Sequence, residues 1–210
     1  MSFVLKEISD QIAVLTINRP DALNAMNDKV VADLESTVQS CIDDKNVGVI
    51  ILTGAGDKAF VAGADIKKMQ SMGAEGALAF GKAGQQMTLT IENSPKPIIA
   101  AVNGFALGGG CEISMACHIR VASESASFGQ PEVLLGILPG WGGTQRLPKL
   151  VGPGMANEII TTGRMVSAAE AKSIGLVNHV VAPEELMNKC IKVANQILKN
   201  GPEAVAQSLD

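Results

Sequence analysis

Two nearly continuous aliphatic segments, residues 47–53 and 97–102, constrain the fold of this chain more than any other feature. Such runs are typical of parallel strands that other elements cover on both faces, whereas a strand with one solvated face alternates apolar and polar residues. Residues 11–18 are also rich in β-branched side chains and run into Arg19-Pro20-Asp21, so they predict a third strand followed by a loop. The chain therefore needs helices that can cover a sheet.

The segments between these strands show the periodicity of helices. Residues 28–43 place apolar side chains three or four positions apart, which predicts one buried face of an amphipathic helix. Residues 74–93 are compatible with a second helix, although their glycines weaken that prediction. With 47% apolar residues and no linker or repeat, the sequence predicts one α/β domain over residues 1–210, with an aliphatic core.

The second half of the chain predicts shorter elements. Ser167 and Glu170 have the spacing of a capping box, which predicts the start of a helix. We also expect a helix at 111–117, short strands at 119–122 and 127–129, a last strand at 176–181, and a helix from Pro183 to Asn200.

Charge and composition exclude several classes of protein. Seventeen basic and 21 acidic residues give a net charge of −4, without the run of Lys and Arg that nucleic-acid binding requires. The longest apolar stretches are far shorter than the roughly 20 residues of a membrane-spanning helix. The first residues lack the pattern of a secretory signal, which predicts a cytoplasmic location. Four scattered cysteines and only two histidines predict buried thiols and no metal site: Cys41, Cys111, Cys117 and Cys190.

A partial dinucleotide-binding fingerprint follows the strand at 47–53, with Gly54, Gly56 and Ala59 at G-x-G-x-x-A spacing. A functional fingerprint opens an unbroken helix and is followed about 20 residues later by an acid at the end of the next strand. Here residues 60–65 interrupt any helix, and the nearby acid falls in a predicted helix. The fingerprint alone is therefore weak evidence for a nucleotide cofactor.

Two loops of small residues, 63–65 and 108–110, each precede a predicted helix. Backbone amides at a helix start point outward, and two of them from separate loops can bind one oxyanion. Glycines in such loops also serve tight turns, and the residues alone leave both interpretations open.

Glu112 and Glu132 are acids in unusually apolar surroundings, in a predicted helix and in a short loop. A carboxylate in such surroundings needs compensation. Each residue alone fits a structural role, as a partner of a helix dipole or as a solvated loop acid. Together in a partly dry pocket, they can hold one water molecule while one carboxyl accepts a proton and the other donates one.

Five motifs occur in a characteristic order, at residues 18–25, 60–66, 100–112, 128–132 and 139–147. They include Asn-Arg-Pro, Phe-Val-Ala-Gly-Ala-Asp, Gly-Gly-Gly-Cys-Glu, Phe-Gly-Gln-Pro-Glu and Pro-Gly-Trp-Gly-Gly-Thr-Gln-Arg-Leu. Through these motifs the chain resembles the crotonase, or enoyl-CoA hydratase, family from about Val14 to its end, and especially its bacterial short-chain members. The resemblance implies a spiral of ββα units, a homotrimer or dimer of trimers, and a chain that stops before the family's usual C-terminal helical segment.

The resemblance also implies a role for each candidate residue. The amides of Ala64 and Gly109 would form an oxyanion hole around the thioester oxygen of an acyl-CoA. Glu132 would give the Cα proton, and Glu112 would activate a water molecule that the Gly140 amide helps to hold. Six further residues match positions that line the groove for coenzyme A: Ala22, Leu23, Ala62, Asp65, Ile66 and Lys67.

The implied activity is that of a hydro-lyase, which adds water to a short-chain enoyl-CoA or catalyses the reverse dehydration. Neither a metal nor a separate cofactor is implied, since coenzyme A is part of the substrate. An enoyl-CoA isomerase, which generally keeps only the second acid, and a catalytically silent CoA-binding or scaffold protein are the alternatives. The sequence departs from the family at His118, where Asp is frequent, and we expect a structural histidine there. Without the C-terminal helices we also expect exposed apolar surface and reduced activity.

Overall fold

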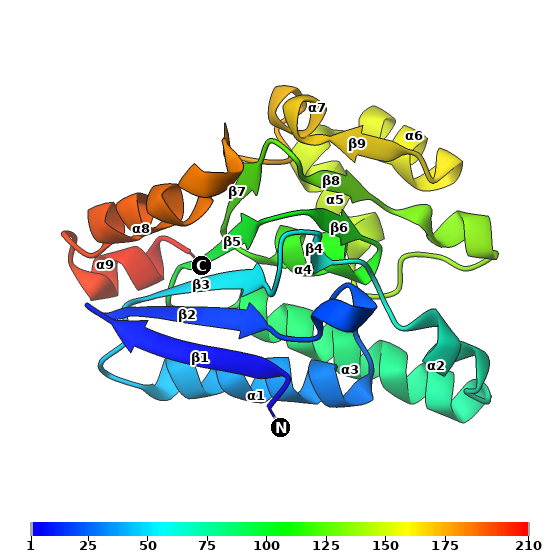
Figure 1. The fold of residues 1–210 in the computed structure, drawn as a ribbon, viewed down its shortest axis with the longest axis horizontal. Helices are drawn as coiled ribbons and strands as arrows, with labels where there is room; N and C mark the ends of the chain where they lie inside the picture. The colour runs from blue at the N-terminus through cyan, green and yellow to red at the C-terminus, as the bar shows by residue number, and fades with distance from the viewer. Residues whose placement is uncertain (1, 210) are drawn as a thin grey trace.

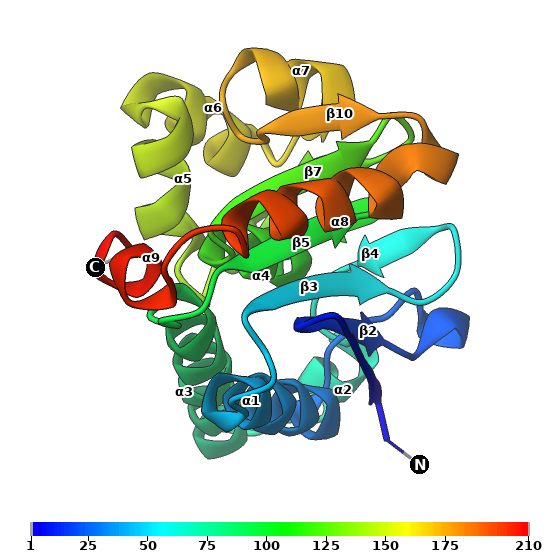
Figure 2. The same cartoon turned by 90° about the vertical axis from the view of Figure 1, so that its left-hand side faces the viewer.

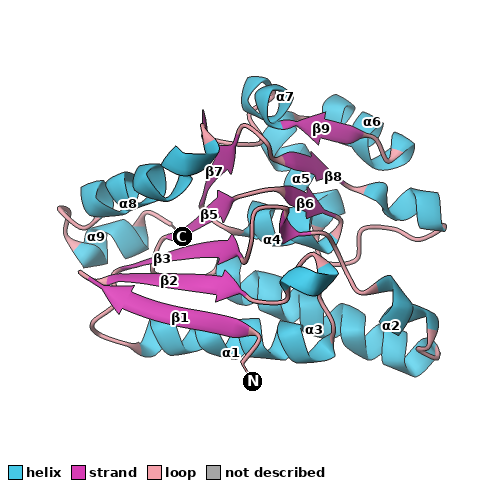
Figure 3. Cartoon of the chain, viewed as in Figure 1, coloured by secondary structure: helices cyan, strands magenta, loops and turns pink. Residues whose placement is uncertain are grey.

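The structure is a computed structural model that describes residues 2–209, and it contains two sheets (Figures 1 and 3). The larger sheet has the strand order β1-β2-β3-β5-β7-β10. β1 runs antiparallel to β2, and the other neighbours run parallel. Its strands are β1 (Val4–Ser9), β2 (Ile12–Ile17), β3 (Val49–Gly54), β5 (Ile98–Val102), β7 (Ile119–Ser123) and β10 (His179–Val181).

The smaller sheet has the order β4-β6-β8-β9, with β9 antiparallel to its neighbour. Its strands are β4 (Ala59–Val61), β6 (Phe105–Leu107), β8 (Ser127–Gly129) and β9 (Met165–Ser167). Three times the chain passes from a strand of the larger sheet to the next strand of the smaller one and then into a helical segment. This repeated ββα unit confirms the expected spiral.

Helices cover both faces of the larger sheet (Figure 2). Ile50 and Leu52 of β3 join a core with α1 (Asp28–Asp43), α3 (Ala74–Glu92) and α4 (Gly109–Ala116). The alternate residues Val49 and Ile51 pack instead with α8 (Leu186–Ile197). Burial on both sides explains the aliphatic run of this strand. The other helical segments are η1 (Pro20–Ala22), α2 (Ile66–Gln70), η2 (Pro131–Leu135), α5 (Gly143–Val151), α6 (Pro153–Thr162), α7 (Ala168–Ser173), η3 (Pro183–Glu185) and α9 (Pro202–Gln207).

Most of the predicted elements are confirmed, and the boundaries of three are corrected. The helix expected from residue 111 begins at Gly109, so two glycines of the loop belong to its first turn. The last strand is shorter than predicted and begins at His179 rather than Leu176. Pro183 opens a separate 3-10 turn, and the helix starts at Leu186 and ends at Ile197, not Asn200.

Several strands gave no sequence signal. β1 exposes five of its six residues, so it lacks the alternation of a half-buried strand. No strand was predicted at β4, β6 or β9, which have three residues each.

The four cysteines are buried free thiols, as predicted. The described residues form no helix with the length and apolar character required to cross a bilayer. His118 exchanges two hydrogen bonds with Ile98 at the start of β5: its Nδ1 accepts from the Ile98 N–H at 2.9 Å, and its own N–H donates to the Ile98 carbonyl at 3.0 Å. This arrangement fits the structural role expected of that histidine.

Candidate active site

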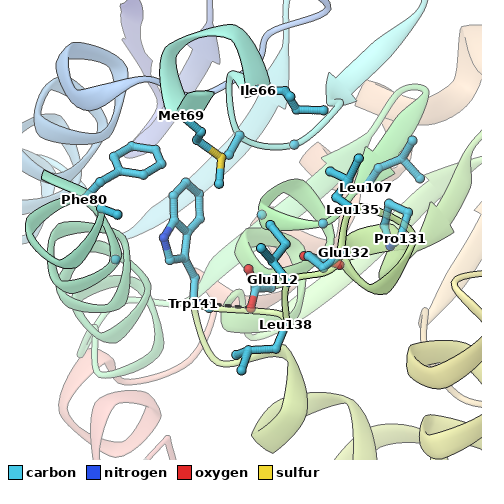
Figure 4. Close-up of a pocket in the computed structure, with 18 of the residues that line it drawn as sticks. Ile66, Met69, Phe80, Leu107, Glu112, Pro131, Glu132, Leu135, Leu138 and Trp141 are labelled. Carbon is cyan, nitrogen blue, oxygen red and sulfur yellow. Dashed lines mark hydrogen bonds between the residues drawn. The ribbon is translucent and has the colours of Figure 1, made fainter. Parts of the chain in front are cut away.

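A pocket of about 410 Å³ lies between α2 and α3 on one side and α4 and η2 on the other (Figure 4). Its lining is mostly apolar, and within the described part of the chain Glu112 and Glu132 are the only charged residues that line it. Seven of the eleven candidate residues meet here: Ala62, Ala64, Ile66, Gly109, Glu112, Glu132 and Gly140.

Glu112 lies in the first turn of α4 and is 2% exposed. Its Oε1 accepts hydrogen bonds from the backbone N–H groups of Trp141 and Gly143, both at 2.7 Å. Gly143 is the first residue of α5, and no side chain at the N-cap of that helix accepts a hydrogen bond from its first turn. Glu112, from another segment, instead accepts the hydrogen bond of the Gly143 N–H. Burial raises the pKa of Glu112, while the two N–H donors and the guanidinium of Arg146 oppose the rise.

Glu132 lies in η2 and is 8% exposed. Its Oε2 is buried and has no hydrogen-bond partner among residues 2–209. A Cβ atom built on Gly108 would stand 2.9 Å from Oε1, so the carboxyl group rests against the glycine loop. Burial raises the pKa of Glu132 to about 7; its own backbone amide lowers that pKa, and the negative charge of Glu112 raises it.

The two carboxyl groups therefore differ in the way that acid–base chemistry requires. Glu112 has two N–H donors and a nearby cation, which favour its ionised form. Only its own backbone amide lowers the pKa of Glu132, which keeps a proton to higher pH. One group in the pair can accept a proton while its neighbour supplies one.

Ala64 and Gly109 bring two backbone amides to the same pocket. Within residues 2–209, neither N–H donates a hydrogen bond to another protein group. Gly109 is the first residue of α4, so its N–H lies at the positive end of that helix. The preceding glycines, Gly63 (φ 112°) and Gly108 (φ 50°), have left-handed backbone conformations that favour glycine. Two N–H groups without a protein acceptor, in loops that line one pocket, are an arrangement that can bind an oxyanion.

Trp141 forms a wall of the pocket, and sequence reasoning gave it no role of its own (Figure 4). A Cβ atom on Gly84 would stand 2.1 Å from the indole, and one on Gly109 would stand 2.5 Å from it. Phe80 meets the indole edge to face, with ring centroids 5.3 Å apart. Gly84, one of the glycines that weakened the helix prediction, is therefore needed where α3 packs on the ring. The signal was present, since the chain's single Trp stands among glycines.

Four candidate residues for the coenzyme A groove, Ala22, Leu23, Asp65 and Lys67, do not line the pocket. The Asp65 carboxylate accepts from the Lys68 N–H as the N-cap of α2 and pairs with Arg19 at 2.8 Å. The hydrogen bond from Arg19 lowers the pKa of Asp65. The Leu23 carbonyl accepts from the Ala62 N–H at 3.0 Å, which ties the 22–23 turn to the loop beside the pocket.

The partial dinucleotide fingerprint does not form a nucleotide-binding turn. β3 leads through residues 55–58 into strand β4 rather than into a helix. A Cβ atom on Gly54 would stand 2.3 Å from the carbonyl oxygens of Ala59 and Phe60, so this glycine allows the two strands to approach closely. Residues 2–209 contain no group of three His, Cys, Asp or Glu side chains that could hold a metal ion.

Comparisons with known proteins identify the family of the chain. A family model described as "Enoyl-CoA hydratase/isomerase" matches residues 7–210. The chain is 53% identical over 205 residues to a crotonyl-CoA hydratase of Syntrophomonas wolfei, a match covering 98% of this chain and 79% of the relative. It is also 53% identical to a short-chain-enoyl-CoA hydratase of Clostridium acetobutylicum, covering 98% of this chain and 78% of the relative. A crystal structure of an enoyl-CoA hydratase from Bacillus anthracis matches with a TM-score of 0.96 and 42% identity, over 99% of this chain and 81% of that one. The chain belongs to the enoyl-CoA hydratase/isomerase family.

Proposed function

We propose that this protein adds water across the α,β double bond of short-chain enoyl-CoA thioesters to give 3-hydroxyacyl-CoA, and catalyses the reverse dehydration. One observation carries the proposal: two buried carboxyl groups with different hydrogen-bond partners line a single pocket beside two unbonded backbone amides. Two relatives named crotonyl-CoA hydratase and short-chain-enoyl-CoA hydratase support both the reaction and the short acyl chain.

In the proposed reaction Glu112 takes a proton from water as the water oxygen bonds to Cβ of the substrate. The π electrons move toward the thioester carbonyl, and the resulting oxyanion is held by the N–H groups of Ala64 and Gly109. Cα then receives the proton of Glu132, which closes the addition. Proton exchange with solvent restores both carboxyl groups. Removing one oxyanion donor typically slows such reactions about 100- to 1,000-fold.

The substrate supplies coenzyme A itself, so the proposed chemistry uses no separate cofactor and no metal. Ala62 and Ile66 line the pocket and are proposed to contact the thioester end of coenzyme A. Ala22, Leu23 and Lys67 stay proposed contacts of its more distant parts. We assign Asp65 a shaping role, because its carboxylate already binds Arg19 and caps α2. The Gly140 amide remains the proposed holder of the water.

The proposed assembly is a homotrimer or a dimer of trimers. Apolar side chains in η2 and the loop after it, including Leu134 and Leu138, are exposed and support contact with another copy of the chain. The mass in solution, measured by light scattering, tests this proposal. A cytoplasmic location stays a prediction of the sequence.

The decisive experiment mixes the purified protein with crotonyl-CoA and follows the absorbance of the conjugated thioester. We expect that absorbance to fall and 3-hydroxybutyryl-CoA to form. The double variant Glu112→Gln/Glu132→Gln, which keeps the size of both side chains, should bind the thioester without turnover. Binding without turnover by the unmodified protein would favour a scaffold instead, and conversion of a 3-enoyl-CoA without addition of water would favour an isomerase.

A further inference from the structure

Arg146 is a buried basic residue for which the proposed reaction provides no role. It lies on α5 and is 7% exposed. Its Nη1 donates to the Trp141 carbonyl at 2.7 Å, and its Nη2 pairs with Glu92 Oε2 at 2.6 Å. An ion pair that buries one of its charges is weak evidence for stability, because the cost of desolvating the Arg146 guanidinium offsets the attraction. The position of this pair suggests another purpose.

The guanidinium holds a loop, residues 139–143, against helix α3. A Cβ atom on Gly142 (φ 106°) would stand 2.1 Å from Nη1, so Arg146 lies directly on the loop backbone. From α3, the Thr88 hydroxyl lies 3.0 Å from the Trp141 carbonyl, and Gln85 Nε2 donates to the Gly140 carbonyl at 2.9 Å. The loop is thus fixed through its carbonyl groups by side chains on two helices.

The same loop holds the proposed base through its N–H groups. Trp141 accepts from Arg146 through its carbonyl and donates to Glu112 through its N–H, and the Gly143 N–H gives Glu112 its second bond. Both bonds reach Oε1, which leaves Oε2 for the water. The orientation of the Glu112 carboxyl group therefore depends on where the peptide groups of Trp141 and Gly143 lie.

We infer that Arg146 is a positioning residue for the proposed hydration: anchored on Glu92, it fixes the loop whose two amides orient the carboxylate of Glu112. The inference rests on the proposed function, in which Glu112 activates the water. A displacement of about 1 Å in such a group can cost about 100-fold in rate. The planar guanidinium bonds the carbonyl and the carboxylate at once, which the single ammonium of lysine does less well.

A second consequence is electrostatic. The charged or titratable groups that face Glu112 are Arg146 from α5, Glu132 from η2 and Cys111 from its own helix. Arg146 lowers the pKa of Glu112. A base must be ionised, so loss of the guanidinium should move the acid limb of the kcat profile to higher pH.

The test measures kcat, KM and their pH dependence with crotonyl-CoA for Arg146→Gln and Arg146→Lys. We expect kcat to fall about 10- to 100-fold in Arg146→Gln with KM changed less than about threefold. The lysine variant should recover part of kcat and return the acid limb toward that of the unmodified protein. Arg164→Gln is the matched control, since Arg164 also binds two carboxylates, Glu158 and Glu170, away from the pocket. It should keep kcat and the acid limb.

Glu92→Gln provides a milder variant if Arg146→Gln folds poorly, because its side chain is 39% exposed. We expect kcat to fall by a smaller factor than in Arg146→Gln, again with little change in KM. Kinetics unchanged for the folded fraction of all three variants would show a purely structural Arg146 and overturn the inference. A crystal structure of Arg146→Gln separates this inference from the proposed function, even if the unmodified protein does not hydrate crotonyl-CoA. Displacement of Glu112 from the two amides supports the inference, and an unmoved Glu112 contradicts it.

Discussion

The two walls of the pocket that carry the glutamates are built in opposite ways. On the α4 side, the eight residues of the helix are all buried, and a Cβ atom on Gly110 would stand within 1.9 Å of the Val61 carbonyl oxygen. On the η2 side, Glu132 is the only buried residue of the segment, and Leu135 is 54% exposed. One wall is part of the core, whereas the other is a short turn at the surface.

This difference sets the chemistry of the pair. The packed wall holds Glu112 where two fixed amides reach it, which favours the carboxylate. The turn buries Glu132 without giving Oε2 a partner, which favours the protonated acid. The proposed roles of base and acid thus match how each wall is packed, and each prediction below tests one part of this contrast.

The largest expected effect is in an assay where only one of the two carboxyl groups, that of Glu132, has a proposed role. Butyryl-CoA has acidic Cα hydrogens but no double bond for water to attack, so its Cα exchange in D2O requires only Glu132 and the oxyanion donors. We expect Glu132→Gln to slow this exchange about 100- to 10,000-fold. Glu112→Gln should exchange within about tenfold of the unmodified protein but lose hydration of crotonyl-CoA. Mass spectrometry measures the exchange.

The opposite pattern, with exchange lost in Glu112→Gln and kept in Glu132→Gln, would reverse the two roles. Equal loss in both variants would mean that the carboxyl groups act as one unit, and the contrast between the walls would then have no chemical meaning. Binding of butyryl-CoA, measured by calorimetry, provides the control for both variants.

The sequence predicted the members of this pair but not the difference between them. Apolar neighbours marked Glu112 and Glu132 as unusual acids, and the motif resemblance gave their roles. The partners of Glu112 are backbone amides of a loop about thirty residues later in the chain, and any residue can supply an amide. The ion pair of Arg146 with Glu92 joins residues 54 positions apart. Contacts of this kind leave no local pattern.

A smaller effect concerns stability on the two sides. Ile113 is fully buried behind Glu112 on α4, so Ile113→Ala should lower the free energy of unfolding by about 2 to 5 kcal/mol. Leu135→Ala on η2 should change it by less than about 0.5 kcal/mol, because that side chain is more than half exposed. Urea denaturation at constant pH measures both. A loss of more than about 2 kcal/mol in Leu135→Ala would show that η2 is held as firmly as α4.

The fold was predictable to the extent that burial left a pattern. The strands covered on both faces, β3 and β5, were identified from aliphatic runs alone. The helix α3 was identified in spite of its glycines, one of which, Gly84, makes room for Trp141, a tertiary feature. β1 was missed because its pairing with β2 is carried by backbone hydrogen bonds and its side chains are mostly exposed. The periodicity of hydrophobic residues indicates which side chains are buried, and it gives no information where backbone groups make the contacts.

The smallest expected effect is a gain of stability in Glu132→Gln at alkaline pH. The native protein keeps the proton of Glu132 up to about pH 7, whereas the same side chain in the unfolded chain loses it near its ordinary pKa of 4.5. Between these values the native state binds more protons, so the free energy of unfolding declines as pH rises. Glutamine is neutral throughout and escapes this decline. The variant should exceed the unmodified protein by about 1 to 3 kcal/mol at pH 8, and by little at pH 4.

Urea denaturation of both proteins at pH 4 and pH 8 checks the sign. Glu184→Gln, a change at an exposed glutamate, is the matched control and should give no pH-dependent difference. If Glu132→Gln gains stability but loses proton transfer, the Glu132 carboxyl group lowers the stability of the native protein and is needed for the reaction. If Glu132→Gln instead loses stability at pH 8, its charge is compensated in the native protein. The charge of Glu132 would then be stabilised as well as that of Glu112, contrary to the difference between the two walls.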